Sequence, residues 1–388
     1  MNKNYLTTKL QPFGTSVFAE MTKMAVDNNA INLSQGFPDF DGPEFIKEAA
    51  CEAIKAGHNQ YANTFGVPAL RKAISEKYKK FYGLSYNPDT EISILAGATE
   101  AIFTTIISII NAGDEVIILE PYYDSYPVAV TMAGGICRYL TLEFPDFKVD
   151  FEKLEALVTK KTRMIIINTP HNPSGKVFTR SELEALAKIA IKHDLIVMSD
   201  EVYEHITFDG VKHIPTATID GMFDRTITIS STGKTFSMTG WKIGTVCAPA
   251  SMCAAVRTAH QYVIFAVATP FQHAMIKGFE APDSFYRELI EFYTAKRDMM
   301  AKSLTQQGFD IVMPKGSYFI MADFTKFGFT NDVEFCKYLT SQIKVAAIPP
   351  TSFYFNKKYG EKLVRFAFCK KEETLAAAAD RLKNLKAK

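Results

Sequence analysis

The sequence has no Cys-x-x-Cys pair, no His-Glu-x-x-His segment and no long apolar run. Six scattered cysteines are typical of reduced thiols in a cytoplasmic protein and do not suggest a disulfide framework. The histidines show no metal-ligand spacing, so no metal site is expected. The apolar run 101–110 is too short to span a bilayer, and residues 1–15 lack the apolar core of a signal peptide. We therefore expect no membrane association.

The chain also lacks an excess of positive or negative charge. The 44 Lys and Arg residues nearly balance 42 Asp and Glu residues, which leaves a formal net charge of +2. That balance gives no electrostatic reason to expect nucleic acid or an anionic membrane as a partner. No Gly-x-Gly-x-x-Gly occurs, which argues against a dinucleotide fold. At 388 residues the chain exceeds the size at which one core stops growing, so two domains are expected.

Short apolar runs alternate with amphipathic segments from about residue 44 to residue 280. This alternation predicts an α/β fold with a mostly parallel central sheet flanked by helices. Ligands of such sheets collect outside the carboxyl ends of the strands. The pattern places strands at 92–96, 115–119, 164–168 and 195–199, and helices at 100–110 and 181–192.

The alternation of apolar runs and amphipathic segments ends at about residue 280, and the different pattern after it predicts a smaller α+β domain. A long helix is expected at 283–307, and the N-terminal segment 1–33 is expected to pack on this unit. The predicted division is a large domain, 44–280, and a small domain made of 1–43 and 281–388. Further strands are expected at 317–324, 345–348 and 363–368, and further helices at 331–341 and 372–385.

The most informative stretch is 230–244, which lies between two apolar strand-like runs. Lys234 stands there among hydroxyl and glycine residues, with Lys242 eight positions on. A deprotonated lysine amine can form a Schiff base with a carbonyl compound, and the surrounding hydroxyls and N–H groups suit a phosphate. We therefore hypothesise that Lys234 carries pyridoxal 5′-phosphate (PLP). A solvated loop lysine is the ordinary alternative.

A P-loop is a second alternative, because 231–235 mimics part of one. That motif needs glycine at position 228, where this chain has Thr228, and no helix obviously follows Lys234. A non-catalytic scaffold of the same fold would be expected to lose Lys234 or Asp200. Both residues are present.

Polar residues at the other expected strand ends are ambiguous when taken singly. Ala98 and Thr99 lie at a helix start that favours an anion, although Thr99 could be a simple N-cap. Asp200 could pair with a pyridine nitrogen or be a surface acid. Asn172 lies in a loop with two X-Pro steps, where it could donate to a phenolate oxygen or be purely structural. Arg365 lies inside an apolar strand, where it could clamp a carboxylate or form an internal salt bridge.

Together, these residues resemble the PLP-dependent class I/II aminotransferases, which have the fold-type-I architecture. The resemblance runs from residue 31 to the last helix. It rests on Ser231-x-x-Lys234, Gly240-x-Lys242-x-Gly244, Asn172-Pro-x-Gly175 and Asp200-Glu-x-Tyr203. Stretches 35–40, 59–62, 168–174 and 233–242 are similar to bacterial methionine aminotransferases and the kynurenine aminotransferase/glutamine transaminase K group. Much of the wider family has arginine at the position of Lys242, and this subgroup shares the lysine.

The resemblance implies a role for each matching residue. Lys234 would hold the cofactor covalently and then act as the catalytic proton carrier. Tyr61 would reach the phosphate of a neighbouring subunit, which implies a homodimer. The cofactor would otherwise contact Asp200 at its pyridine nitrogen, Asn172 and Tyr203 at its 3′ oxygen, Tyr123 and Val202 on its two ring faces, and Ala98, Thr99, Ser231 and Lys242 at its phosphate. The substrate would contact Arg365, the Gly36 backbone, Asn172 and Phe18.

The mouth of the site offers aromatic rings and no obvious second arginine for a distal carboxylate. The implied activity is ping-pong transfer of an amino group from methionine, aromatic amino acids, kynurenine or glutamine to a 2-oxo acid. A PLP-dependent cysteine-conjugate carbon–sulfur β-lyase is the alternative, and no residue separates the two. The aromatic candidates are Phe13, Phe18, Phe37, Tyr262 and Phe265.

Overall fold

A computed structural model describes residues 5–388 and contains a central seven-stranded sheet. Its order is β2-β8-β7-β6-β5-β3-β4, and only β8 runs antiparallel to its neighbours. The mostly parallel α/β sheet expected from the sequence is confirmed. The strands are β2 Ile92–Ala96, β3 Glu115–Glu120, β4 Ile136–Thr141, β5 Thr162–Asn168, β6 Ile196–Asp200, β7 Thr226–Ser231 and β8 Ile243–Cys247.

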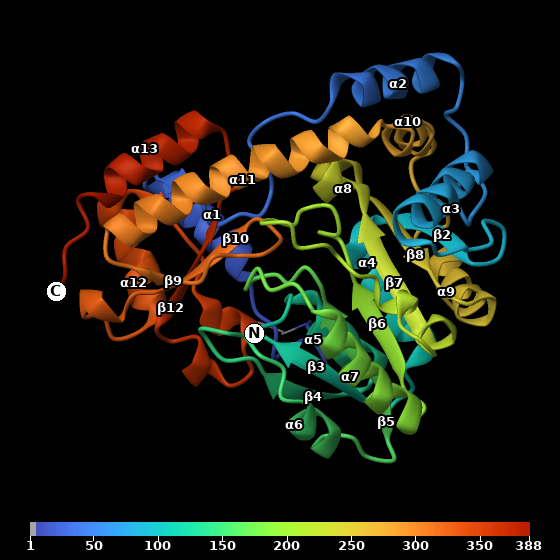
Figure 1. The fold of residues 1–388 in the computed structure, drawn as a ribbon, viewed down its shortest axis with the longest axis horizontal. Helices are drawn as coiled ribbons and strands as arrows, with labels where there is room; N and C mark the ends of the chain where they lie inside the picture. Colours follow the sequence, from blue (N-terminus) through green and yellow to red (C-terminus); the bar gives the residue numbers. More distant parts are fainter. Residues whose placement is uncertain (1–4) are drawn as a thin grey trace.

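Helices cover both faces of this sheet (Figure 1). On β5, Ile165 and Ile167 belong to the cluster beneath α6 and α7, while Met164 and Ile166 face the cluster of α4, α5 and α9. This period-two alternation buries both faces, and each such side chain contributes about 1.5–3 kcal/mol. The helices are α4 Gly97–Ile109, α5 Ser125–Ala133, α6 Phe151–Ala156, α7 Arg180–Lys192 and α9 Ala250–Val263.

A further helical layer packs on the β2/β8 edge. It consists of α2 Glu44–Lys55, α3 Pro68–Tyr82 and α10 Thr269–Phe279. Proline at the first position of α3 and a left-handed Gly83 after its last residue mark the two ends of that helix.

The C-terminal part forms a separate layer around a three-stranded antiparallel sheet, β12-β10-β9. The N-terminal helix α1 (Val17–Asp27) joins this layer, and β1 (Ile31–Asn32) pairs with β11 (Val345–Ala346). The long helix α11 (Asp283–Gln306) runs from beside α13 toward α10 (Figure 1). The other elements are β9 Asp310–Ile311, β10 Phe319–Asp323, β12 Leu363–Ala367, α12 Asp332–Tyr338 and α13 Glu372–Leu382. The exact domain division stays a prediction.

Most expected boundaries shift by a few residues, and three differences matter for the site. Helix α4 begins at Gly97, so Thr99 lies within its first turn and is not the N-cap. A four-residue helix, α8 (Thr232–Thr235), contains Lys234, where no helix was expected. The strand expected at 345–348 shortens to two residues, and Ile348 instead forms an isolated bridge with Arg365. Local turns of this length leave little periodic signal in a sequence.

Strand register brings the polar residues to one edge of the sheet. Asn168 is opposite Asp200, and Ser231 is opposite Gly244. Because β8 is antiparallel, its first residues lie beside the last residues of β2 and β7, so Lys242 joins the same edge.

Close backbone contact at this edge gives a testable consequence. A Cβ built on Gly244 would come within 2.4 Å of the Gly97 carbonyl carbon, whereas one on Gly240 would meet nothing within 4 Å. We expect Gly244→Ala to lower the free energy of unfolding by about 1–3 kcal/mol, because backbone atoms must move apart. Gly240→Ala is the matched control. Urea unfolding of both variants measures the difference, and equal midpoints would contradict the predicted clash.

Candidate active site

A cavity of about 380 Å³ opens at this edge of the sheet. Every cofactor or substrate contact implied by the sequence resemblance lines it except Tyr61. Its walls therefore join side chains from six separate segments of the sheet with others from the N-terminal and C-terminal parts. The lining residues are Phe18, Gln35, Gly36, Phe37, Gly97, Ala98, Thr99, Tyr123, Asn168, Asn172, Asp200, Val202, Tyr203, Ser231, Gly233, Lys234, Thr239, Lys242, Phe319 and Arg365.

Lys234 projects into the cavity from α8. Its Nζ donates to the Gly36 carbonyl over 3.2 Å and lies 5.7 Å from the centre of the Tyr203 ring. Burial lowers the pKa of Lys234 to about 8, and Lys242 and Arg365 act in the same direction. Burial is the largest of these causes. A substantial fraction of the amine is neutral near physiological pH, as a nucleophile or base requires.

Asp200 is the acidic group of the cavity and is almost fully buried. Its Oδ2 accepts from the Tyr126 hydroxyl over 2.6 Å, and Oδ1 accepts from the Val202 N–H over 3.3 Å. Burial raises the pKa of Asp200 to about 6, against the lowering effect of those two donors. The carboxyl is therefore mainly ionised at neutral pH.

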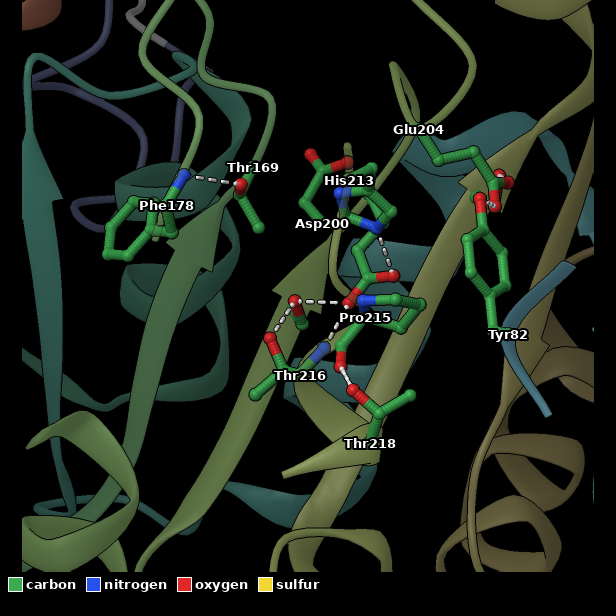
Figure 2. Close-up of polar contacts among 12 residues, drawn as sticks. Tyr82, Thr169, Phe178, Asp200, Glu204, His213, Pro215, Thr216 and Thr218 are labelled. Carbon is green, nitrogen blue, oxygen red and sulfur yellow. Dashed lines mark hydrogen bonds and ion pairs between the residues drawn. The ribbon is translucent and has the colours of Figure 1, made fainter. Parts of the chain in front are cut away.

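Two further acids near Asp200 in the sequence, Glu201 and Glu204, bind other groups of the protein. Glu201 accepts from Thr216 N over 3.0 Å and lies 2.9 Å from His213 Nε2. Glu204 accepts from the Tyr82 hydroxyl over 2.9 Å (Figure 2). It also pairs with the buried Lys77. Glu201 and Glu204 thus bind other groups of the protein and do not line the cavity, so Asp200 is the acid available to a ligand.

The opposite end of the cavity suits an anion. The N-terminus of α4 opens onto it, where free N–H groups and the helix dipole favour negative charge. Gly97 has φ of +76°, and a Cβ there would lie 3.0 Å from Lys242 Nζ. Thr99 and Ser231 add hydroxyls. Glycine therefore leaves the space in which a phosphate could lie against the backbone and Lys242.

Arg365 reaches the cavity from β12 of the C-terminal part. Its Nη1 donates to Asn172 Oδ1 over 3.1 Å and its Nη2 to the Ser34 carbonyl over 2.7 Å, while Nε has no partner. Within residues 5–388 no carboxylate forms an ion pair with it, so the internal salt bridge considered from the sequence is absent. Burial lowers the pKa of Arg365 to about 10. Its buried positive charge is free to bind a carboxylate.

Sequence reasoning missed several residues that shape the site. Asn168 donates to the Asp200 carbonyl over 2.8 Å and accepts from Asn172 N over 2.6 Å, which fixes the strand ends relative to each other. The Arg365 guanidinium lies 4.2 Å from the centre of the Phe319 ring. Asn168 was detectable as the last polar residue of an apolar strand. Phe319 gave no such signal.

Three aromatic residues assigned to the mouth lie elsewhere in the single chain. Phe13 lines an adjoining cavity of about 790 Å³, which meets the first at Thr99 and Lys242. Tyr262 and Phe265 are exposed, and neither lines these cavities in the described part of the chain. The local sequence pattern does not predict which cavity an exposed loop lies beside.

Tyr61 is 81% exposed and lies outside both cavities. Its ring contacts that of Phe265 edge to face, at 5.1 Å between centroids. In this structure Tyr61 therefore does not reach the end of its own chain's cavity that suits an anion.

Comparison with known proteins agrees with this geometry. The model of the family "Aminotransferase class I and II" matches residues 28–382. Methionine aminotransferase of Escherichia coli is 42% identical over 378 residues, covering 97% of this chain and 98% of the relative. Kynurenine–oxoglutarate transaminase of Dictyostelium discoideum is 42% identical, covering 96% and 95%. The solved structure of N-succinyldiaminopimelate aminotransferase from Mycobacterium tuberculosis is 43% identical, with a TM-score of 0.96 over 98% of this chain and 100% of that one.

The fold and site define a PLP-dependent aminotransferase of fold type I, and the chain belongs to the class I and II aminotransferase family. The residues present fit the cofactor. Lys234, Lys242 and Arg365 outnumber the single free acid Asp200, so an anionic group is needed to balance the cavity. The unpartnered Arg365 Nε and the space at Gly97 point the same way.

No helix among residues 5–388 has the length and apolar character to cross a membrane. The same residues contain no cluster of three or more His, Cys, Asp or Glu side chains arranged to hold a metal ion.

The lowered pKa of the Lys234 amine can be measured directly. Only a neutral amine reacts with an acylating reagent, so labelling of Lys234 in the PLP-free protein should rise as pH increases through about 8. Labelling of ordinary surface lysines should rise at about pH 10.4. Mass spectrometry of peptides labelled at a series of pH values gives both curves from one sample. A Lys234 curve that coincides with the surface lysines would contradict the assigned environment.

Proposed function

We propose that this aminotransferase takes its amino group from methionine, aromatic amino acids, kynurenine or glutamine and passes it to a 2-oxo acid. The observation that carries the choice is the composition of the cavity. Arg365 is the one arginine among its described lining residues, and the walls near it are aromatic. The names of the Escherichia coli and Dictyostelium discoideum relatives support neutral donors. Asp124 in the adjoining cavity would also repel a distal carboxylate.

We propose the cofactor contacts that the sequence resemblance implies, because each of these side chains lines the cavity. Asp200 would pair with the pyridine nitrogen, and Asn172 and Tyr203 would bind the 3′ oxygen. Tyr123 and Val202 would enclose the ring from its two faces. Ala98, Thr99, Ser231 and Lys242 would hold the phosphate.

When bound, PLP supplies an aldehyde carbon and an electron-withdrawing ring that stabilises negative charge on the adjoining carbon. Lys234 would hold the cofactor until an amino acid takes its place, and its freed amine would then move a proton from the substrate Cα. Arg365 and the Gly36 backbone would fix the α-carboxylate, with Phe18 over the side chain. Asp200 would keep a positive charge on the pyridine nitrogen, and the second half-reaction would use the same residues in reverse.

We further propose a homodimer with shared sites. Lys242 and Thr99 are exposed in the single chain, beside the 790 Å³ cavity, while Tyr61 and Phe265 form an exposed aromatic pair. Tyr61 of the partner subunit would enter from this side and reach the phosphate. A cytoplasmic location is proposed from the scattered, unpaired cysteines. The carbon–sulfur β-lyase alternative gains no support from any of these observations.

The cofactor assignment predicts a visible absorption band in the purified protein after PLP addition. Lys234→Ala should remove the covalently attached form of the band and lower the transamination rate by at least about 10³-fold, because anchor and proton carrier are lost together. Absorption spectra and an oxo-acid assay measure the two effects. Lys176→Ala, at a lysine outside the cavity, is the control. An unchanged band in the Lys234 variant would sink the assignment.

The substrate proposal has a separate test. We expect kcat/KM for methionine and phenylalanine to exceed that for aspartate by at least about tenfold, because a distal carboxylate finds no second arginine in the cavity. Competition assays with one fixed oxo acid give the ratios. Faster turnover of aspartate would overturn the substrate choice while leaving the enzyme class intact.

A further inference from the structure

Tyr126 lies behind the cavity and does not line it. It is buried in the first turn of α5, and its hydroxyl donates to Asp200 Oδ2 over 2.6 Å. Its ring also meets that of Tyr123 edge to face, with centroids 5.8 Å apart. One side chain therefore contacts both the acid and the ring assigned to the cofactor.

We propose that Tyr126 is a positioning residue that orients the Asp200 carboxylate and keeps it ionised for the cofactor nitrogen. This rests on the proposed role of Asp200. A phenol that donates to a carboxylate stabilises its charged form, and the bond is strong where water is excluded. Burial also makes the Tyr126 hydroxyl harder to ionise, so its pKa is raised and it remains a donor.

The other groups around Asp200 cannot replace this donor. The Val202 N–H is more distant, at 3.3 Å from the other oxygen. Lys234 favours the ionised form of Asp200 by charge alone, while Glu201 disfavours it. Burial raises the pKa values of Tyr123 and Tyr203, and the charge of Asp200 acts in the same direction, but neither hydroxyl donates a hydrogen bond to this carboxylate. Tyr126 is therefore the short neutral donor to Asp200 among the described residues.

The pH dependence follows from the raised Asp200 pKa. Protonated Asp200 cannot pair with a protonated pyridine nitrogen, so cofactor retention should fall as pH decreases through about 6. Without the Tyr126 hydroxyl the ionised form loses a donor, and the Asp200 pKa should rise further. The loss of cofactor should then occur at a higher pH.

The experiment measures PLP retention by the full-length holoenzyme, dialysed at a series of pH values from 5 to 8. Tyr126→Phe should move the midpoint of cofactor loss upward by about one pH unit, the size expected when a carboxylate loses one hydrogen bond. Tyr139→Phe, at a partly buried tyrosine of β4 that lines neither cavity, should leave the midpoint unchanged. Titration of the cofactor phosphate is common to all variants and cancels in the comparison.

Two further variants distinguish a specific effect of Tyr126 on Asp200 from a general destabilisation of the site. In an Asp200→Asn background the Tyr126→Phe change should have no effect on the midpoint, because the titrating carboxyl is gone. Incorporation of 3-fluorotyrosine at position 126 keeps the shape, makes the phenol a stronger donor and should shift the midpoint downward. The proposal is overturned by a wild-type profile in Tyr126→Phe, by an equal shift in Tyr139→Phe, or by a shift that persists in the Asp200→Asn background. Failure of the unmodified chain to retain any PLP would instead contradict the cofactor assignment.

Discussion

Uncompensated positive charge is the constraint on which the site depends. Lys234, Lys242 and Arg365 meet at one cavity that has a single free carboxylate, Asp200. Of these cations Lys242 is exposed in the single chain, but Arg365 is buried and Lys234 partly buried, and burying charges without ionic partners is costly. The surrounding structure holds them apart with neutral oxygens, such as the Gly36 and Ser34 carbonyls and the Asn172 amide. An anionic cofactor and a carboxylate substrate complete an arrangement that folding alone leaves unbalanced.

The sheet supplies the rigid half of that arrangement. Parallel register sets the ends of β5, β6 and β7 side by side, and the reversed strand β8 returns Lys242 to the same edge. The other half comes from the C-terminal layer through Arg365 and from the segment around Gly36. The Gly36 carbonyl accepts from both Lys234 and the Tyr318 hydroxyl, so that segment is fixed by residues from both parts.

The sequence predicted the sheet class and the chemistry-bearing residues because both leave local signals. Lys234 stands among hydroxyl and glycine residues, Asp200 ends an apolar strand and Arg365 interrupts one, so each was a candidate, but only their order and spacing together indicated their roles. Tyr126 left no such signal, and Asn168 could be recognised as the polar end of an apolar strand but could not be given a role. Their roles depend on where α5 begins and on how β5 aligns with β6, and neither is encoded within a short window. Of the aromatic residues expected at the mouth, Phe18 and Phe37 line the cavity, whereas the sequence does not reveal which surface the exposed Tyr262 and Phe265 face.

The hydrogen bond from Arg365 Nη1 to Asn172 Oδ1 crosses from the C-terminal layer to the loop after β5. A carboxylate arriving at the guanidinium competes with that amide oxygen, and the same amide is proposed to contact the cofactor. The two ligands would thus communicate through one side chain, with an interaction free energy that each experiences equally. Donor and cofactor recognition in this enzyme would then be thermodynamically linked, so that selectivity changes whenever the cofactor end is altered.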